Sequence, residues 1–302
     1  MSIQRLKALQ KIMQIPSAET PLTFKDIGNC KVVLKRDDLI HPIVSGNKWR
    51  KLQPQLEYAV QNGVAHVVSL GGGYSNHLHA LGYCCRELDI NCTALIRGDY
   101  TQHLTPMLRD LNEWGVKLHY LTKREFAERN TSAFADWVKH TYPDSHMIPE
   151  GGSHPLALGG VAEAMQELEQ HYDYIILPVA SGATMAGIIA ASQPTTTIIG
   201  IGVLKGEGYL EGLVKRFMDE QNITATNWTI LHDYHCGGYA RSTPELTAFC
   251  RQFSEQNEID IEPVYSGKTL MALTHLLRNH YFPDGCRILC WHTGGLQGAR
   301  ID

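Results

Sequence analysis

The sequence predicts an α/β protein built on parallel sheets that are wrapped by helices. Short apolar runs alternate with helical segments along most of the chain, and most of the predicted strands lead directly into a helix. The chain has 302 residues, which is long for a single hydrophobic core. Two domains, or one large α/β unit, are expected on these grounds.

Seven short apolar segments are predicted as strands, namely His66 to Leu70, Thr93 to Ile96, Lys117 to Leu121, Tyr174 to Val179, Thr197 to Val203, Thr229 to Leu231 and Arg287 to Trp291. Eight segments are predicted as helices, namely Lys48 to Asn62, Asn76 to Leu88, Arg124 to His140, Gly160 to Gln170, Ala183 to Ala191, Leu210 to Glu220, Pro244 to Gln256 and Thr269 to His280. Proline and glycine are dense from Ile148 to Pro155, so we expect the chain to cross there between two lobes.

The composition favours small-molecule chemistry. The balance of 27 Lys plus Arg against 31 Asp plus Glu provides no basic surface for nucleic acid or for an anionic membrane. The N-terminal segment lacks the apolar run of a signal peptide, and no stretch approaches the length of a membrane span. The eight cysteines show no disulfide framework and no Cys-x-x-Cys pair. We expect a soluble cytoplasmic protein with reduced, mostly buried thiols.

Lys48 is the first candidate catalytic residue, because turn-forming residues precede it and a helix is predicted to begin beside it. An amine in a dry pocket loses part of its preference for the charged form and can attack a carbonyl carbon. A lysine of this kind carries a Schiff base. On this segment alone, however, a solvated helix face formed by Lys48, Arg50 and Lys51 is the stronger interpretation.

Two glycine-bearing turns follow predicted strands, at the strand ends where ligands bind in α/β proteins. The first, Gly71 to His77, leads into a helix whose free N–H groups suit a carboxylate or a phosphate, although Ser75 is also a good structural N-cap. The second, Ser181 to Thr184, offers small residues that can surround a phosphate. It lacks the Gly-Lys-Ser/Thr ending of a nucleotide P-loop, which favours a monophosphate held without metal. Close helix-to-strand packing explains the second turn equally well.

A third turn, Cys290 to Gly295, follows the last predicted strand and can place Thr293 against the edge of a planar ring. A lysine that can form an imine, a phosphate-binding turn and further glycine turns around one cleft predict a pyridoxal phosphate site more economically than any other cofactor site. The histidines make poor metal ligands, since His77 and His79 lie on different faces of a helix. No metal is expected.

Several motifs occur in order along the chain: Lys35 to Asp38, Ser45 to Leu52, Gly71 to His77, Ser181 to Thr184, Gly237 to Tyr239, Pro263 to Lys268 and His292 to Gly295. With these motifs the chain resembles, nearly end to end, the fold-type II pyridoxal phosphate enzymes in the group of D-cysteine desulfhydrase and 1-aminocyclopropane-1-carboxylate deaminase. The resemblance implies two doubly wound domains like those of the tryptophan synthase β subunit. The large cofactor-binding domain would comprise residues 1–50 and 151–302, and the small α/β domain residues 51–150, with the cofactor between them.

The resemblance also implies roles for the residues that bind the cofactor. Lys48 would form the Schiff base and then act as the base at the substrate α-carbon, while Asn76 would hydrogen-bond the 3′ oxygen of the ring. The remaining cofactor-binding residues would be Ser181, Gly182, Ala183 and Thr184 around the phosphate, and Ser266 and Thr293 beside the ring.

The substrate would lie between further residues that the resemblance identifies. Ser75, Asn76 and His77 would receive its carboxylate, and Tyr239 and Tyr265 would flank it. One tyrosine hydroxyl would act on the leaving group. The expected catalytic residues are Lys48, Ser75, Tyr239 and Tyr265, and the enzyme would be a lyase or a hydrolase that works as a homodimer.

Two positions favour one activity within this group. The deaminases have motifs similar to Tyr-Glu-Gly-Lys and His-Leu-Gly-Gly. This chain has Ser266 in place of the glutamate and Thr293 in place of the leucine, and both residues match the desulfhydrases. A glutamate beside the pyridine nitrogen would keep it protonated and make the ring a strong electron sink, whereas a hydroxyl allows a neutral pyridine. A weaker sink suffices to expel a good leaving group such as sulfide. We therefore expect β-elimination from D-cysteine, or a related small D-amino acid, to sulfide, ammonia and pyruvate.

Three other functions are compatible with the sequence. One is a deaminase that releases 2-oxobutanoate and ammonia from 1-aminocyclopropane-1-carboxylate, and another is a lyase for a different amino acid such as D-serine. The third is a protein that carries pyridoxal phosphate without turnover, which would not need Tyr239 and Tyr265. Two departures from the family pattern bear on the substrate: His77 replaces a glutamine, and the short tail from Leu296 to Asp302 is expected to open the site or to move an oligomer contact.

Overall fold

The computed structural model describes residues 2–24 and 29–300 and contains two β-sheets. The six-stranded sheet has the order β1-β2-β10-β7-β8-β9, and its neighbouring strands are parallel except for β1 and β2. Its strands are β1 (Glu19–Leu22), β2 (Lys31–Lys35), β7 (Tyr174–Val179), β8 (Thr197–Gly202), β9 (Trp228–Leu231) and β10 (Arg287–Trp291). The four-stranded sheet is parallel throughout, with the order β5-β4-β3-β6. Its strands are β3 (His66–Gly72), β4 (Asn91–Arg97), β5 (Lys117–Leu121) and β6 (Ser145–Ile148).

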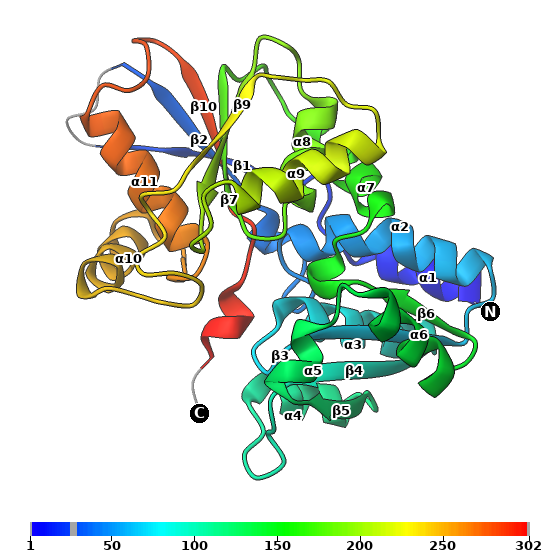
Figure 1. The fold of residues 1–302 in the computed structure, drawn as a ribbon. Coiled ribbons are helices and arrows are strands. Elements are labelled where there is room, and N and C mark those ends of the chain that lie inside the picture. The colour runs from blue at the N-terminus through cyan, green and yellow to red at the C-terminus, as the bar shows by residue number, and fades with distance from the viewer. Residues whose placement is uncertain (1, 25–28, 301–302) are drawn as a thin grey trace.

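Helices cover both faces of the larger sheet, which lies above the smaller sheet in Figure 1. One face packs on α7 (Pro155–Met165), α8 (Ala183–Ala191) and α9 (Tyr209–Glu220), and the other on α10 (Pro244–Asn257) and α11 (Ser266–Arg278). Consecutive strand residues enter different cores, since Ile175 faces the first helix group and Ile176 the second. Burial on both faces explains why these strands are nearly continuous apolar runs. The doubly wound parallel fold expected from the sequence is therefore confirmed.

The smaller sheet is also covered on both faces. The helices α1 (Ser2–Lys11), α2 (Asn47–Gln61), α3 (Asn76–Leu88) and α4 (Pro106–Glu113) share one core with it, and α5 (Lys123–Ala127) and α6 (Ser132–Thr141) pack on the other face. Val67 and Val68 of β3 accordingly enter opposite cores. The long helix α2 runs between the two sheets and also contacts α7 (Figure 1).

All seven predicted strands are present, with bounds within two residues of the prediction. The prediction missed β1, β2 and β6, and the helices α1 and α4. The single helix predicted from Arg124 to His140 was wrong, because the chain forms two helices there, each capped by its own threonine, Thr122 and Thr131. No helix among the described residues combines the length and the apolar character needed to cross a lipid bilayer.

The chain passes from the smaller sheet to the larger one through a tight segment. The strand β6 ends at Ile148, a short 3-10 helix covers Glu150–Gly152, and α7 begins at Pro155. Gly151 and Gly152 both have φ of +68°, a backbone conformation that side chains disfavour. The division into domains of residues 1–50 with 151–302 and of residues 51–150 stays a prediction.

Candidate active site

The start of α2, where Lys48 lies, is fixed against the turn that follows β10. The backbone N–H of Asn47 donates to the carbonyl oxygen of Thr293 at 3.2 Å. Gly46 has φ of +68°, and a Cβ atom there would lie 1.8 Å from that same oxygen. Only glycine fits at this junction, so the backbone beside Lys48 and the backbone of Thr293 are in direct contact.

Lys48 has the electrostatic environment of a reactive amine. Burial lowers its pKa to about 8 from an ordinary value of 10.5, and the negative charge of Glu262 opposes part of that change. Its Nζ donates to Asn47 Oδ1 at 2.5 Å, and Asn47 Nδ2 in turn donates to Thr184 Oγ1 at 3.0 Å. Asn47, which sequence reasoning did not single out, therefore links the predicted cofactor lysine to the predicted phosphate turn.

The solvated helix face that was the stronger interpretation of this segment alone is wrong. Arg50 and Lys51 are only 3% and 2% exposed. Arg50 forms ion pairs with Asp37 at 2.9 Å and with Glu167, and Asp37 also accepts a hydrogen bond of 2.7 Å from Trp291 Nε1. These buried charges join α2 to the strands of the larger sheet and fix the direction in which α2 enters the site.

The Ser181–Thr184 turn lies at the carboxyl end of β7 and opens α8. Ser181 Oγ accepts a hydrogen bond of 2.6 Å from Ser153 Oγ, and Lys51 Nζ lies 3.5 Å from Ser153 Oγ. Gly182 has φ of +83°, and a Cβ atom there would press on the backbone of Leu213. The structure thus adds Lys51 and Ser153 to the predicted turn residues, although their positions 102 residues apart gave no sequence signal.

The residues gathered around Lys48 fit pyridoxal phosphate. Lys48 and Lys51 are neighbouring amines, and the pKa of Lys51 is held well below 10.5 by burial and by the charge of Lys48. A phosphate dianion would neutralise this concentration of positive charge, and the N-terminus of α8 adds free N–H donors. Lys48 would be the amine close enough to react with the aldehyde of the cofactor. Among the described residues, no group of three His, Cys, Asp or Glu side chains is arranged to hold a metal ion.

The turn after β3 presents Asn76 in one orientation. Ser75 caps α3 by accepting the N–H of Leu78 at 3.2 Å, which is the structural role considered for it from the sequence. Asn76 Oδ1 accepts the backbone N–H of Gly298 at 3.0 Å. Its Nδ2 group is consequently the part left to donate to a ring oxygen, as the predicted role of Asn76 requires.

His77 is buried beside Ser69 of β3, close to Gly152 and to the charges of Lys51 and Lys48. Its Nε2 lies 2.8 Å from Ser69 Oγ, while its Nδ1 is buried without a hydrogen-bond partner among the described residues. Burial, followed by the charges of Lys51 and Lys48, holds the pKa of His77 well below 6.5, so the ring is neutral. A substrate carboxylate at this turn would depend on the first N–H groups of α3 rather than on a histidine charge.

The C-terminal segment contacts the smaller sheet's helices and reaches the site through Asn76. A 3-10 helix covers Leu296–Ala299, and Arg300 Nη2 lies 2.5 Å from Asp110 Oδ2 on α4. The same carboxylate oxygen is 2.7 Å from His79 Nε2. The red C-terminal ribbon descends to the smaller sheet in Figure 1. Residues 298 and 300 therefore contact Asn76 and α4, while Ile301 and Asp302 lie outside the described residues.

Tyr239 and Tyr265 form a hydroxyl pair. Their oxygens are 2.8 Å apart, and their rings meet edge to face at 6.1 Å. Burial and the neighbouring Tyr239 raise the pKa of Tyr265 well above 10, so Tyr265 keeps its proton. Lys268, which is fully buried, donates to the carbonyl oxygens of Gly238 at 2.9 Å and Val203 at 3.1 Å. Sequence reasoning missed this lysine as the residue that fixes the loop of Tyr239.

Ser266 lies beside the carboxylate of Glu262, a residue that belongs to none of the sequence motifs. Its Oγ donates to Glu262 Oε1 at 3.1 Å and accepts the N–H of Glu262 at 3.0 Å. Glu262 also accepts backbone N–H groups of Val264, Tyr265 and Ser266, and it is 2% exposed. Because Glu262 takes the proton of Ser266, the hydroxyl oxygen is left as an acceptor. A ring nitrogen facing Ser266 would then be favoured in its protonated form, in contrast to the neutral pyridine expected from the sequence.

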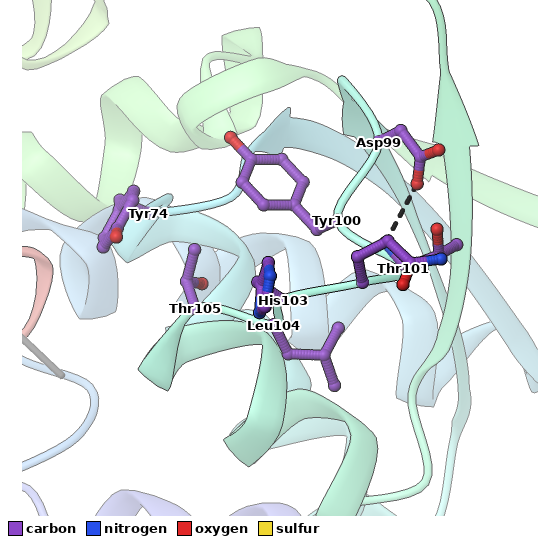
Figure 2. Close-up of a pocket in the computed structure, with 8 residues that line it drawn as sticks. Tyr74, Asp99, Tyr100, Thr101, His103, Leu104 and Thr105 are labelled. Carbon is purple, nitrogen blue, oxygen red and sulfur yellow. Dashed lines mark hydrogen bonds between the residues drawn. The ribbon is translucent and has the colours of Figure 1, made fainter.

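A surface pocket of about 340 Å³ adjoins the same region. Figure 2 shows Tyr100, His103 and Thr105, from the segment after β4, gathered near Tyr74 of the turn after β3. Thr105 Oγ1 donates to the carbonyl of Gly73 at 2.5 Å and so attaches this segment to the turn. None of the predicted site residues lines the pocket, and the converging groups described above lie outside it.

Comparisons with known proteins agree with this geometry. A sequence profile described as pyridoxal-phosphate dependent enzyme matches residues 14–294. A bifunctional D-cysteine desulfhydrase/1-aminocyclopropane-1-carboxylate deaminase, mitochondrial, of Arabidopsis thaliana is 28% identical and covers 88% of this chain and 72% of its own. A D-cysteine desulfhydrase of Klebsiella pneumoniae is 26% identical over 98% of this chain and 97% of its own. A solved structure described as an ACC deaminase homologue has a TM-score of 0.80 at 24% identity, covering 98% of this chain and 96% of its own, and shows the shared fold.

Proposed function

Because the chain belongs to the pyridoxal-phosphate dependent enzymes, we propose that it is a lyase that eliminates sulfide from D-cysteine, or a related small D-amino acid, and releases ammonia and pyruvate. The observation that carries the proposal is the half-buried amine of Lys48, whose pKa is about 8, hydrogen-bonded through Asn47 to Thr184 of the Ser181–Thr184 turn. When bound, pyridoxal phosphate supplies an electron sink for electrons released at the substrate α-carbon.

In this proposal the protein holds the cofactor at three points. The Ser181–Thr184 turn, Lys51 and Ser153 receive the phosphate, whose charge matches the two neighbouring amines. Asn76 donates through Nδ2 to the ring oxygen, because Gly298 occupies its Oδ1. Ser266, backed by Glu262, would accept a hydrogen bond from the ring nitrogen, and Thr293 would lie beside the ring.

Proton transfer falls to Lys48 and to the tyrosine pair. An amine with a pKa of about 8 is close to the pH at which it works, so Lys48 can take a proton from the α-carbon and return it. Tyr265 keeps its proton and can donate it, directly or through Tyr239, to the departing sulfur. The carboxylate of the substrate would meet the N-terminus of α3 at Ser75, Asn76 and His77, where backbone N–H groups are available.

Ser266 and Thr293 favour the desulfhydrase reaction over the deaminase reaction because both match the desulfhydrase motifs. A neutral pyridine does not support this preference, since Glu262 leaves the Ser266 hydroxyl as an acceptor. The deaminase remains the second candidate because the Arabidopsis relative carries both activities in its name. A desulfhydrase breaks a carbon–sulfur bond by elimination, so lyase is the class that fits, and hydrolase was wrong. A carrier without turnover would have no use for the paired hydroxyls of Tyr239 and Tyr265. A cytoplasmic location and a homodimer remain part of the proposal.

A panel of D- and L-amino acids, with 1-aminocyclopropane-1-carboxylate, tests the proposal. D-Cysteine should give sulfide and pyruvate in equal amounts, and Lys48→Ala should abolish both products. Tyr265→Phe should keep the yellow colour of the bound cofactor while it lowers kcat by about 100-fold. Sustained turnover by Lys48→Ala would refute the role of Lys48, and release of 2-oxobutanoate from the cyclopropane substrate alone would establish the deaminase instead.

A further inference from the structure

Two cysteines that the active site does not use lie side by side at the start of neighbouring strands. Cys30 precedes β2 and Cys286 precedes β10, and the strand register pairs Lys31 with Arg287 directly beyond them. The N–H of Lys31 donates to the carbonyl oxygen of Cys286 at 2.9 Å. The two Sγ atoms are 3.3 Å apart, although the residues are 256 positions apart in the sequence.

We propose that Cys30 and Cys286 form a reversible disulfide bond when the protein meets a low-molecular-weight disulfide. The Cys30 thiolate attacks the small disulfide, which gives a mixed disulfide and one free small thiol. Cys286 then attacks the Cys30 sulfur and releases the second small thiol. Two protein thiols are oxidised in total, one small disulfide is reduced to two thiols, and the two thiol protons leave with the products.

The order of these steps follows from the surroundings of the two thiols. Cys30 is partly exposed, whereas Cys286 is only 7% exposed, so an oxidant reaches Cys30 first. Burial, together with the hydrogen bond to Cys30, raises the pKa of Cys286 to about 12, which makes it a poor first nucleophile. Its sulfur is nevertheless already in contact with Cys30, so the second step needs only a small movement.

A second pair of neighbouring cysteines provides a contrast within the same chain. Cys85 and Cys92 also share a side-chain hydrogen bond, but both are buried in the core of the smaller sheet. Neither offers a partly exposed sulfur for the first attack. Proximity alone therefore does not predict oxidation in this protein. The partial exposure of Cys30 to solvent distinguishes the reactive pair from Cys85 and Cys92.

The bond would join the strands whose far ends build the active site. The strand β2 leads to Asp37 and the start of α2, and β10 leads to Thr293. Five residues of strand separate the cysteines from those ends, a length of about 16 Å. Oxidation should therefore stabilise the sheet, because it closes a very long loop, without moving the groups around Lys48.

The test is incubation of the purified holoenzyme in buffers of oxidised and reduced glutathione. Two of the eight thiols should be lost, peptide mapping should find Cys30 joined to Cys286, and the Tm should rise by about 5 °C. Cys286→Ser should stop at a glutathione adduct on Cys30, Cys30→Ser should take up none, and Cys85→Ser should behave as the wild type. Retention of all eight thiols, or a bond between any other two cysteines, would overturn the proposal.

Discussion

The backbone N–H of Asn47 donates to the carbonyl oxygen of Thr293, and so the helix that bears Lys48 begins directly on the turn that ends the last strand. Residues at the two ends of the sequence thereby meet with no side chain between them, because Gly46 occupies the junction. Gly294 is equally restricted, since a Cβ atom there would lie 2.9 Å from the backbone of Gly46. The position of Lys48 depends on this backbone contact.

Gly46→Ala should remove most of the activity and lower the Tm strongly. The added methyl group would meet the backbone of Thr293, which cannot move aside as a flexible side chain does. Gly63→Ala is the matched control, because Gly63 also has positive φ but has nothing within 4 Å of the added Cβ. It should cost about 1 kcal/mol for backbone strain alone. Equal losses in thermal unfolding for the two variants would contradict the junction described here.

The pKa of Lys48 should appear in the pH dependence of cofactor capture. Apoprotein mixed with pyridoxal phosphate should be trapped by borohydride on Lys48 at a rate that rises up to about pH 8 and then levels off. Mass spectrometry of the trapped peptide measures this rate, with Lys48→Ala as the blank. A rate that keeps rising towards pH 10, as for an ordinary lysine, would show that burial does not lower this pKa.

The same shift affects the stability of the apoprotein. Between about pH 8 and pH 10.5, Lys48 is neutral in the folded state and charged in the unfolded state. The unfolded state binds more protons there, so the contribution of Lys48 to stability increases with pH across this interval. Lys48→Met should flatten the corresponding rise in Tm relative to wild-type apoprotein measured at the same pH values.

Asp37→Asn should destabilise the protein by about 3–5 kcal/mol, because the buried charge of Arg50 would lose the negative charge that pairs with it. The new amide NH2 group would also face N–H donors, those of Arg50 and Trp291, instead of accepting from them. Asp89→Asn is the control. Asp89 pairs with Arg5 at 3.0 Å on the surface, where both side chains are well exposed, and should cost less than about 1 kcal/mol. Thermal unfolding of the two variants measures the difference, and similar losses would show that the Arg50 network is dispensable.

Ser266→Glu should fail as a single substitution for the deaminase reaction. The new carboxylate would lie beside Glu262, which is 3.1 Å from the present hydroxyl, and two carboxylates cannot both stay charged there. Ser266→Glu with Glu262→Gln and Thr293→Leu should recover stability and shift the ratio of activities towards 2-oxobutanoate. Assays of both substrates with each variant test this coupling, and purely additive effects would argue against it.

Lys268→Met should lower kcat more than it raises KM, because Lys268 holds the loop of Tyr239 through the carbonyl oxygen of Gly238. Two buried carbonyl groups would lose their donor, at a cost of about 1–3 kcal/mol each. Tyr239→Phe, which removes the hydroxyl and leaves the loop anchored, is the comparison. An unchanged kcat in Lys268→Met would show that the loop holds its position without this amine.

The strands of the parallel sheets could be predicted because burial on both faces makes them continuous apolar runs, as in Tyr174–Val179 and Arg287–Trp291. The strand β1 was missed because it is a partly exposed edge strand that contains Pro21. The strand β2 ends in Lys35. A lysine normally indicates a surface position, but Lys35 is fully buried beside Glu19 and Glu167. Local pattern cannot reveal a charge whose partners are distant in the sequence.

The limit of local sequence pattern also explains which residues of the candidate site could be predicted. Lys48 was predicted because turn-forming residues precede it at a helix start, and the glycine turns were predicted because strand ends gather at one edge of a parallel sheet. Lys51, Ser153 and Glu262 were not found, since each acquires its surroundings only when separate elements pack together. The hydrogen bond between the His77 ring and Ser69 was likewise outside the reach of the motif, which predicted only a place near the substrate carboxylate.

The closeness of Lys48 and Lys51 has a consequence for chemoselectivity when the cofactor is loaded. Both amines have depressed pKa values, so both are potential nucleophiles. A phosphate dianion next to Lys51 favours its ammonium form and removes it from competition for the aldehyde. Loading would therefore be accompanied by proton uptake from the solvent, and the retention of the coenzyme would weaken as the medium becomes alkaline.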